Sequence, residues 1–169
     1  IYGYIPYWVN RSSGLPYSSS VLQEFTRGNY PTKFYQLCTP KCKEVAQRRA
    51  GRKTDKSGRE FCLELENNGG EAMAGSHPKA TIYNKDAMAC AVSHYSQISD
   101  VTLALIDDMG WYTVNWSMAQ QMTWGAHELL TEEELNKFYE KPVHRNFPAH
   151  YMNAVPSSIS IGHDHKSFG

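Results

Sequence analysis

The central part of the chain, Leu63 to Gly125, contains the features that most restrict its fold. An apolar run from Val101 to Ile106, with Thr102 as its one polar residue, follows Ser99-Asp100 and is closed by Gly110. Ser or Asp before a helix and Gly after it are common helix boundaries. Apolar residues around most of the circumference indicate a buried helix. The sequence therefore predicts a short, buried helix from Val101 to about Asp108.

Two loops precede this helix. A short predicted strand, Phe61 to Glu66, is followed by Asn67-Asn68-Gly69-Gly70, and both residue types of this turn tolerate positive φ. A second glycine-containing loop carries Gly75-Ser76-His77, and Met88 follows eleven residues later in Asp86-Ala87-Met88. The pattern predicts ordered loops between the strand and the buried helix.

These residues, in this order and at this spacing, resemble the C-terminal half of the leishmanolysin-like zinc metallopeptidase domain, which belongs to the metzincin group. The resemblance is clearest from Leu63 to Gly125 and includes the Gly-Gly turn, Ser-His, a Met-turn and Gly-Trp-Tyr. It implies an α+β fold, mostly helix and irregular loops, that forms the C-terminal lobe of such a domain. It also implies that His77 stands at the third zinc-ligand position and Met88 at the Met-turn.

The other catalytic residues of this family are missing from the chain. Metzincins take two zinc ligands and the general base from a His-Glu-x-x-His helix, and the nearest string here, His127-Glu128-Leu129-Leu130-Thr131, ends in Thr. Lys79 lies two residues after His77, and a cation beside a metal site disfavours the metal. We therefore assign no catalytic residue. We expect no cofactor in this chain alone, with zinc only if a partner or missing segment supplies further ligands.

Three functions are compatible with this combination. The favoured interpretation is a degenerate, non-catalytic protein, a pseudoenzyme that acts as a structural or accessory subunit of a larger assembly. The first alternative is a fragment of an active zinc metalloendopeptidase whose His-Glu-x-x-His helix lies on a preceding or separate chain. The second is a surface adhesion or binding module, because eleven Tyr and four Trp residues can provide a contact patch.

The C-terminal part is expected to be distinct. We place the end of the resemblance at Gly125 and divide the chain into a lobe, 1–125, and a C-terminal helix with an extended arm, 126–169. Thr131 and Glu134 form a capping box, which predicts a helix that ends at about Glu140.

The predicted arm runs from Pro142 to Gly169 and has no helical period. Its scattered aromatic residues predict that it lies on other protein subunits. Within it, His163-Asp164-His165 places two imidazoles on one face of an extended strand, which makes it a second candidate metal site.

Net charge and the length of the apolar runs limit which classes of partner are expected. The 17 basic and 17 acidic residues cancel, so we expect no nucleic acid or anionic membrane as the main partner. No apolar run is long enough for a transmembrane segment.

The chain begins with Ile1 and shows no signal peptide, as expected of a processed chain or a fragment. The family resemblance implies a secreted or cell-surface location, and the low cysteine count equally fits an intracellular complex such as a mitochondrial one.

The cysteines leave the redox state open. The four residues allow two disulfides in three pairings and are Cys38, Cys42, Cys62 and Cys90. Cys38 and Cys42 form a C-x3-C pair that would place two thiols one helical turn apart, a spacing compatible with zinc.

A second helix is predicted from Thr39-Pro40, with Thr as the N-cap and Pro at the first helical position, to about Arg49. The basic stretch from Arg48 to Arg59 overlaps its end. Such a stretch indicates either a patch that binds an anionic partner or a solvated loop.

Overall fold

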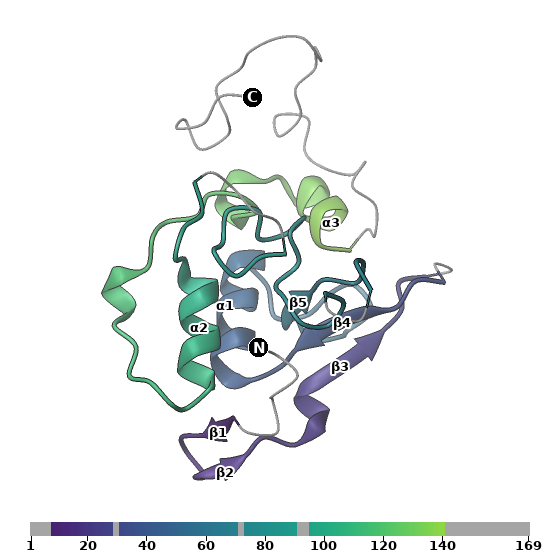
Figure 1. The fold of residues 1–169 in the computed structure, drawn as a ribbon. Coiled ribbons are helices and arrows are strands. Elements are labelled where there is room, and N and C mark those ends of the chain that lie inside the picture. The colour runs from purple at the N-terminus through teal and green to yellow at the C-terminus, as the bar shows by residue number, and fades with distance from the viewer. Residues whose placement is uncertain (1–7, 29–30, 71–72, 91–94, 141–169) are drawn as a thin grey trace.

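A small antiparallel sheet and three helices form the fold, and long loops connect them (Figure 1). The structure is a computed structural model that describes residues 8–28, 31–70, 73–90 and 95–140. The main sheet has the order β3-β4-β5, with strands Leu22–Phe25, Phe34–Leu37 and Leu63–Leu65. A separate hairpin pairs β1, Val9–Asn10, with β2, Leu15–Pro16. The predicted α+β class, mostly helix and irregular loop, is confirmed.

Helix α1, Pro40–Ala50, begins where the sequence predicted, but its N-terminus is capped differently. Thr39 makes no side-chain capping bond. The Asp108 carboxylate instead accepts the backbone N–H groups of Lys41 at 3.1 Å and Cys42 at 2.8 Å. A carboxylate at a helix N-terminus also interacts favourably with the helix dipole. The cap therefore comes from a distant residue, which local sequence signals do not reveal.

Helix α2, Asp100–Asp108, confirms the predicted buried helix. The Ser99 side chain caps it by accepting the Val101 N–H at 3.1 Å. Most of its side chains are buried, including Leu105, and α2 packs against α1, with the two helices side by side in Figure 1. Gly110 follows the helix with φ of 76°, as expected of the residue after a helix end.

A disulfide joins Cys38, just after β4, to Cys62, just before β5. The C-x3-C zinc hypothesis is therefore wrong, because the Cys38 sulfur is bonded to Cys62. Cys42 and Cys90 remain thiols. Burial raises the pKa of the Cys42 thiol well above its usual value, so this thiol stays protonated.

Helix α3, Glu132–Glu140, confirms the predicted capping box. Glu134 accepts the Thr131 N–H at 2.9 Å, and the Thr131 hydroxyl oxygen accepts the Glu134 N–H at 3.3 Å. Phe138 of α3 packs edge to face on Trp124 with ring centroids 6.2 Å apart. Residues on both sides of residue 125 thus share one core.

Three short 3-10 helices complete the described elements: Ser19–Val21, Trp116–Met118 and His127–Leu129.

The hydrophobic core lies between the helices and the sheet. It consists of side chains from every part of the described chain, among them Trp8, Leu37, Val45, Leu63, Leu65, Tyr83, Val101, Leu105, Met122, Trp124, Phe138 and Tyr139. Within the described ranges, no helix combines the length and apolar content needed to cross a membrane. The predicted arm from Pro142 onward, with His163-Asp164-His165, lies outside the described residues.

Candidate functional site

His77 lies at the end of a loop that starts and finishes beside β5. The Glu66 N–H donates to the His77 carbonyl at 2.8 Å, and the Gly75 N–H donates to the Glu66 carbonyl at 2.7 Å. After His77 the chain returns along the strand, where Lys79 N–H donates to the Glu64 carbonyl at 3.0 Å. The loop is therefore fixed to the sheet on both sides of the histidine.

A hydroxyl lies within hydrogen-bond distance of the His77 ring. Ser76 Oγ is 3.0 Å from the Met73 carbonyl, to which it can donate, and 2.8 Å from His77 Nδ1. When the hydroxyl donates to the carbonyl, Oγ accepts from Nδ1–H and the lone pair of the ring lies on Nε2. Burial also lowers the pKa of His77, which favours the neutral ring that a metal requires.

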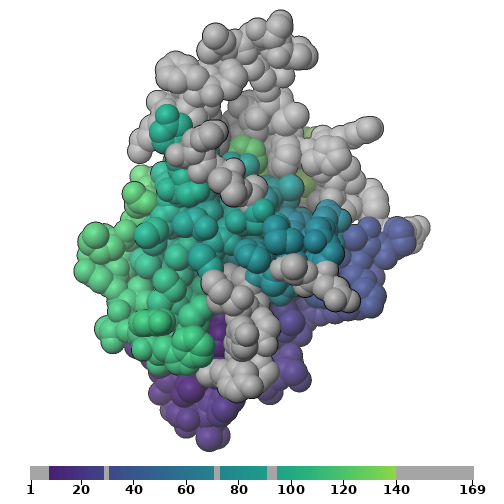
Figure 2. Space-filling model, in the orientation of Figure 1, coloured from purple at the N-terminus to yellow at the C-terminus, as the bar shows by residue number. Residues whose placement is uncertain are grey.

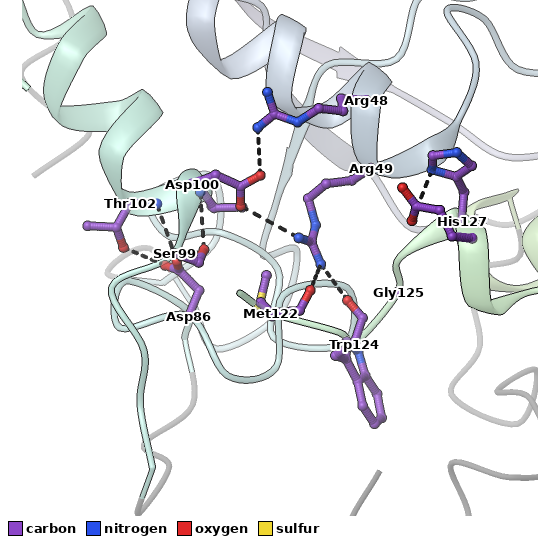
Figure 3. Close-up of polar contacts among 12 residues, drawn as sticks. Arg48, Arg49, Asp86, Ser99, Asp100, Thr102, Met122, Trp124, Gly125 and His127 are labelled. Atoms are coloured by element: carbon purple, nitrogen blue, oxygen red, sulfur yellow. Dashed lines mark hydrogen bonds and ion pairs between the residues drawn. The ribbon is translucent and has the colours of Figure 1, made fainter. Parts of the chain in front are cut away.

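Met88 lies on a second loop that is held by one buried carboxylate. Asp86 accepts the Met88 N–H at 2.9 Å, the Ser99 hydroxyl at 2.5 Å and the Thr102 hydroxyl at 2.8 Å. Figure 3 shows Asp86 pointing at Ser99 and Thr102, which lie at the start of α2. The Ala87 N–H donates to the Gln97 carbonyl at 2.8 Å, which closes the loop. The Met88 loop is thus attached to α2.

The two loops are in direct contact. The Cys90 N–H, two residues after Met88, donates to the carbonyl of Pro78, next to His77, at 3.3 Å. Both His77 and Met88 are half-buried, and Met88 packs against the core. In Figure 2 the teal segment that contains both loops lies in the middle of the face toward the viewer. The fold therefore brings the loops of both sequence-predicted site residues together.

Lys79, the cation that follows His77 in the sequence, is paired with carboxylates. Its ammonium is buried and lies 3.6 Å from a Glu64 carboxylate oxygen and 3.9 Å from one of Glu66, and it also donates to Asn67. Arg27 forms a bidentate pair with Glu64 at 3.0 and 2.5 Å. Two cations and two carboxylates thus balance beside His77. Sequence reasoning missed this cluster, because Glu64 and Glu66 read as ordinary strand residues.

The residues that the structure describes do not form a complete metal site. Among them, no three His, Cys, Asp or Glu side chains are grouped so that they could hold a metal ion. A catalytic zinc requires three protein ligands, so the described part offers His77 as a single candidate ligand. His127 packs elsewhere, against Gly51 at the end of α1, with Nδ1 3.4 Å from Glu128.

A buried arginine links α1 to the last residues of the Leu63 to Gly125 stretch. Arg49 donates to the carbonyls of Met122 at 3.0 Å and Trp124 at 2.6 Å, and it lies 3.5 Å from Asp100 (Figure 3). The sequence places Arg49 in a stretch that is either solvated or binds anions. The structure shows instead that Arg49 is buried and joins α1 to the backbone near Trp124.

The loops of His77 and Met88 lie between the edge strand β5 and the buried helix α2. The sequence pattern of the family described as leishmanolysin (Peptidase_M8) matches residues 23–155. The chain belongs to the leishmanolysin family. The match runs past residue 125, so the expectation that the resemblance ends there is wrong; α3 is part of the matched region.

Individual relatives agree with this assignment. The chain is 44% identical to a leishmanolysin-like peptidase of Drosophila melanogaster over 62 residues, 37% of this chain and 9% of that protein. It is 35% identical to one of Caenorhabditis elegans over 91 residues, 54% of this chain and 13% of that protein. It is 32% identical to leishmanolysin of Leishmania major over 112 residues, which are 63% of this chain and 17% of that protein. The chain therefore spans a small part of the length of these relatives.

Proposed function

We propose that this chain provides the third-ligand loop and the Met-turn of a leishmanolysin-type zinc endopeptidase site. The observation that carries the proposal is the 2.8 Å contact between Ser76 Oγ and His77 Nδ1, which leaves Nε2 as the ring nitrogen for a metal ion. Metal-binding histidines usually donate their other ring N–H to a nearby acceptor in this way. The remaining two ligands and the general base would come from another segment or chain. A bound zinc would activate water for peptide hydrolysis.

The environment of His77 supports this role. The contact between Cys90 and Pro78 places the Met88 loop beside the His77 loop. The ion pairs of Lys79 remove the electrostatic objection to a cation at this place. This chain's own task would be to hold and orient one ligand, with Asp86 fixing the loop of Met88 to α2. The disulfide between Cys38 and Cys62 is favoured in an oxidising, secretory compartment.

The non-catalytic accessory subunit remains a competing proposal. In that role the protein needs no His-Glu-x-x-His segment, and the 169 residues contain none. In that role His77 would be a structural residue, and contact with other subunits would go through the C-terminal arm. The two proposals differ in one measurable property, namely whether His77 binds metal once the missing ligands are supplied.

The direct test joins the chain to a segment that bears the His-Glu-x-x-His helix of the family, and measures zinc content and peptidase activity. We expect the joined protein to bind zinc and hydrolyse a peptide, whereas the 169-residue chain alone should not hydrolyse it, because it lacks two ligands and a base. His77→Ala should lower zinc affinity by more than about 100-fold, beyond the usual effect of an outer-shell partner.

The matched control is His127→Ala, which removes an imidazole far along the chain from the proposed site. Equal zinc affinity in the two histidine variants would contradict the proposal and favour the accessory role. Circular dichroism of both variants should be unchanged, which separates ligand loss from unfolding.

A second prediction concerns Ser76. Ser76→Ala removes the hydroxyl that contacts His77 Nδ1 but leaves the imidazole in place. We expect zinc affinity of the joined protein to fall by about 10–100-fold, the range for outer-shell partners of a metal-binding histidine. Ser57→Ala is the control, because this hydroxyl bonds to Asp55 in a different loop. An unchanged affinity in Ser76→Ala would show that the hydroxyl does not orient the ring.

A further inference from the structure

A cavity of about 350 Å³ lies between the end of β3 and the basic loop that follows α1. Its walls include Arg27, Gly28, Asp55, Lys56, Ser57 and Arg59. Three of these side chains are cationic and one is anionic, although the whole chain has a net charge of zero. Glu64, which is not among these wall residues, pairs with Arg27, so the wall together with this partner carries one net positive charge, which attracts anions.

Arg59 is held in a fixed orientation in this wall. Its guanidinium Nη2 lies 2.7 Å from an Asp55 carboxylate oxygen, and the group stacks over the Phe25 ring at 3.4 Å from the centroid. A guanidinium that is already ordered loses little entropy when it binds a further group. Its planar set of N–H donors matches the oxygen atoms of a carboxylate, phosphate or sulfate.

Arg27 is a second, buried cation in the wall. Its terminal nitrogens pair with Glu64, but its Nε is buried and makes no hydrogen bond to any part of the chain that the structure describes. Burial lowers the pKa of Arg59, a shift that Asp55 and Glu64 oppose and the positive charge of Arg27 reinforces. An anion between the two guanidinium groups would interact favourably with both.

Asp55 organises the loop and is itself saturated with donors. One of its oxygens accepts the Ser57 N–H at 2.8 Å, the Ser57 hydroxyl at 2.6 Å and the Arg59 N–H at 3.0 Å. Although burial raises it, these bonds and the Arg59 charge hold the pKa of Asp55 below its usual value. The carboxylate is therefore ionised, and its hydrogen bonds order the loop that carries Lys56 and Arg59. The basic stretch is thus a structured loop and not only a solvated run of charges.

We propose that this cavity binds a tetrahedral oxyanion, a sulfate or phosphate group, through Arg27, Lys56 and Arg59. The cations approach it from two segments that are distant in the sequence, the end of β3 and the basic loop, and the disulfide-linked sheet holds one of these segments in place. None of these residues lies on the His77 or Met88 loops, although Arg27 shares the Glu64 carboxylate with Lys79, and the test below requires no zinc.

The test is a titration of the full chain with sodium phosphate and with sodium sulfate, compared with sodium chloride at the same ionic strength. Amide resonances of Gly28, Ser57 and Gly58 should shift saturably with the oxyanions and not with chloride. Arg59→Gln should weaken binding by about tenfold, since it removes a charge-assisted hydrogen-bond donor. Lys56→Gln should weaken it by about threefold, because this side chain is exposed.

Arg11→Gln is the matched control, since it removes one positive charge from a residue that pairs with Asp107, away from the cavity. Its affinity for phosphate should equal that of the unaltered chain. Lys56 is exposed, so Lys56→Gln keeps the test valid even if a change at Arg59 disturbs the loop. The proposal is overturned if the oxyanions cause no saturable shift, or if Lys56→Gln and Arg59→Gln bind phosphate as tightly as Arg11→Gln.

The oxyanion can be free or carried by a lipid, and a second arm of the experiment distinguishes the two. Vesicles of phosphatidic acid are compared with vesicles of phosphatidylcholine in a sedimentation assay. Binding to the first vesicle alone, lost in Arg59→Gln, assigns the site to a lipid phosphate. Phosphate binding without vesicle binding assigns it to a soluble oxyanion. Both results support an oxyanion site.

Discussion

Gly110→Ala is expected to destabilise the chain by about 4 kcal/mol or more, an effect that few single substitutions reach. Gly110 has φ of 76°, a left-handed conformation that costs a residue with a Cβ roughly 1–2 kcal/mol. A Cβ at this position would also lie 2.1 Å from the Val9 carbonyl oxygen, which belongs to the backbone. Since a backbone carbonyl cannot turn aside as a flexible side chain can, the N-terminal segment itself would have to move.

The segment that would move is attached to the core. The Val9 N–H donates to the Met109 carbonyl at 3.1 Å, and the adjacent Trp8 is fully buried. Displacing Val9 therefore weakens both a hydrogen bond and the packing of a large aromatic side chain. Because whole domains are stable by only about 5–15 kcal/mol, Gly110→Ala removes a large part of the free energy of unfolding.

The control is Gly14→Ala. Gly14 has a similar φ of 68°, but an added Cβ there would meet no atom within 4 Å. Its substitution should cost only the backbone strain of about 1–2 kcal/mol. Comparing the free energies of unfolding of the two variants in urea separates the cost of backbone strain from the cost of the close contact with Val9. Equal losses in the two variants would contradict the close contact between Gly110 and Val9.

The parts of this fold that the sequence predicts are those encoded locally. The capping box at Thr131 and Glu134, the Ser99 cap of α2 and the glycine after α2 all act within a few residues, so the sequence is sufficient to place these helices. The loops of His77 and Met88 were placed through the family resemblance. That they touch, through Cys90 and Pro78, required the structure.

The parts that the sequence does not predict depend on distant partners. Asp108, at the end of α2, caps α1, and Arg49 holds the backbone near Trp124. The disulfide of Cys38 with Cys62 was one of several pairings that the sequence allowed. The sequence shows the charge of Lys79 but not that Glu64 and Glu66 lie next to it. In each instance the deciding interaction joins segments that are far apart in the chain.

Glu64→Gln is expected to cost about 3–5 kcal/mol, the usual penalty when one member of a buried ion pair is removed. The substitution keeps the size of the side chain and removes its charge. Arg27 then loses its bidentate partner, and Lys79 loses one of its two carboxylates. All three side chains are buried, so water cannot replace the lost charge.

Glu60→Gln provides the control for this experiment. Glu60 is exposed, and its carboxylate lies 3.4 Å from the Lys43 ammonium; exposed ion pairs contribute roughly 0–1 kcal/mol. Thermal and urea unfolding of Glu60→Gln should therefore resemble those of the unaltered chain. If Glu64→Gln and Glu60→Gln unfold alike, the charges around Lys79 are not buried as the structure shows.

A double substitution identifies the cause of the loss. Combining Glu64→Gln with Arg27→Met removes the cation that the first change leaves without its carboxylate. If an unpaired buried charge is responsible, the double variant should be more stable than Glu64→Gln alone, because buried pairs are often replaced by apolar residues at little cost. If the second change adds a further loss, the pair itself stabilises the sheet through its geometry. Either result also bears on His77, since the same carboxylate balances the Lys79 cation next to the proposed ligand loop.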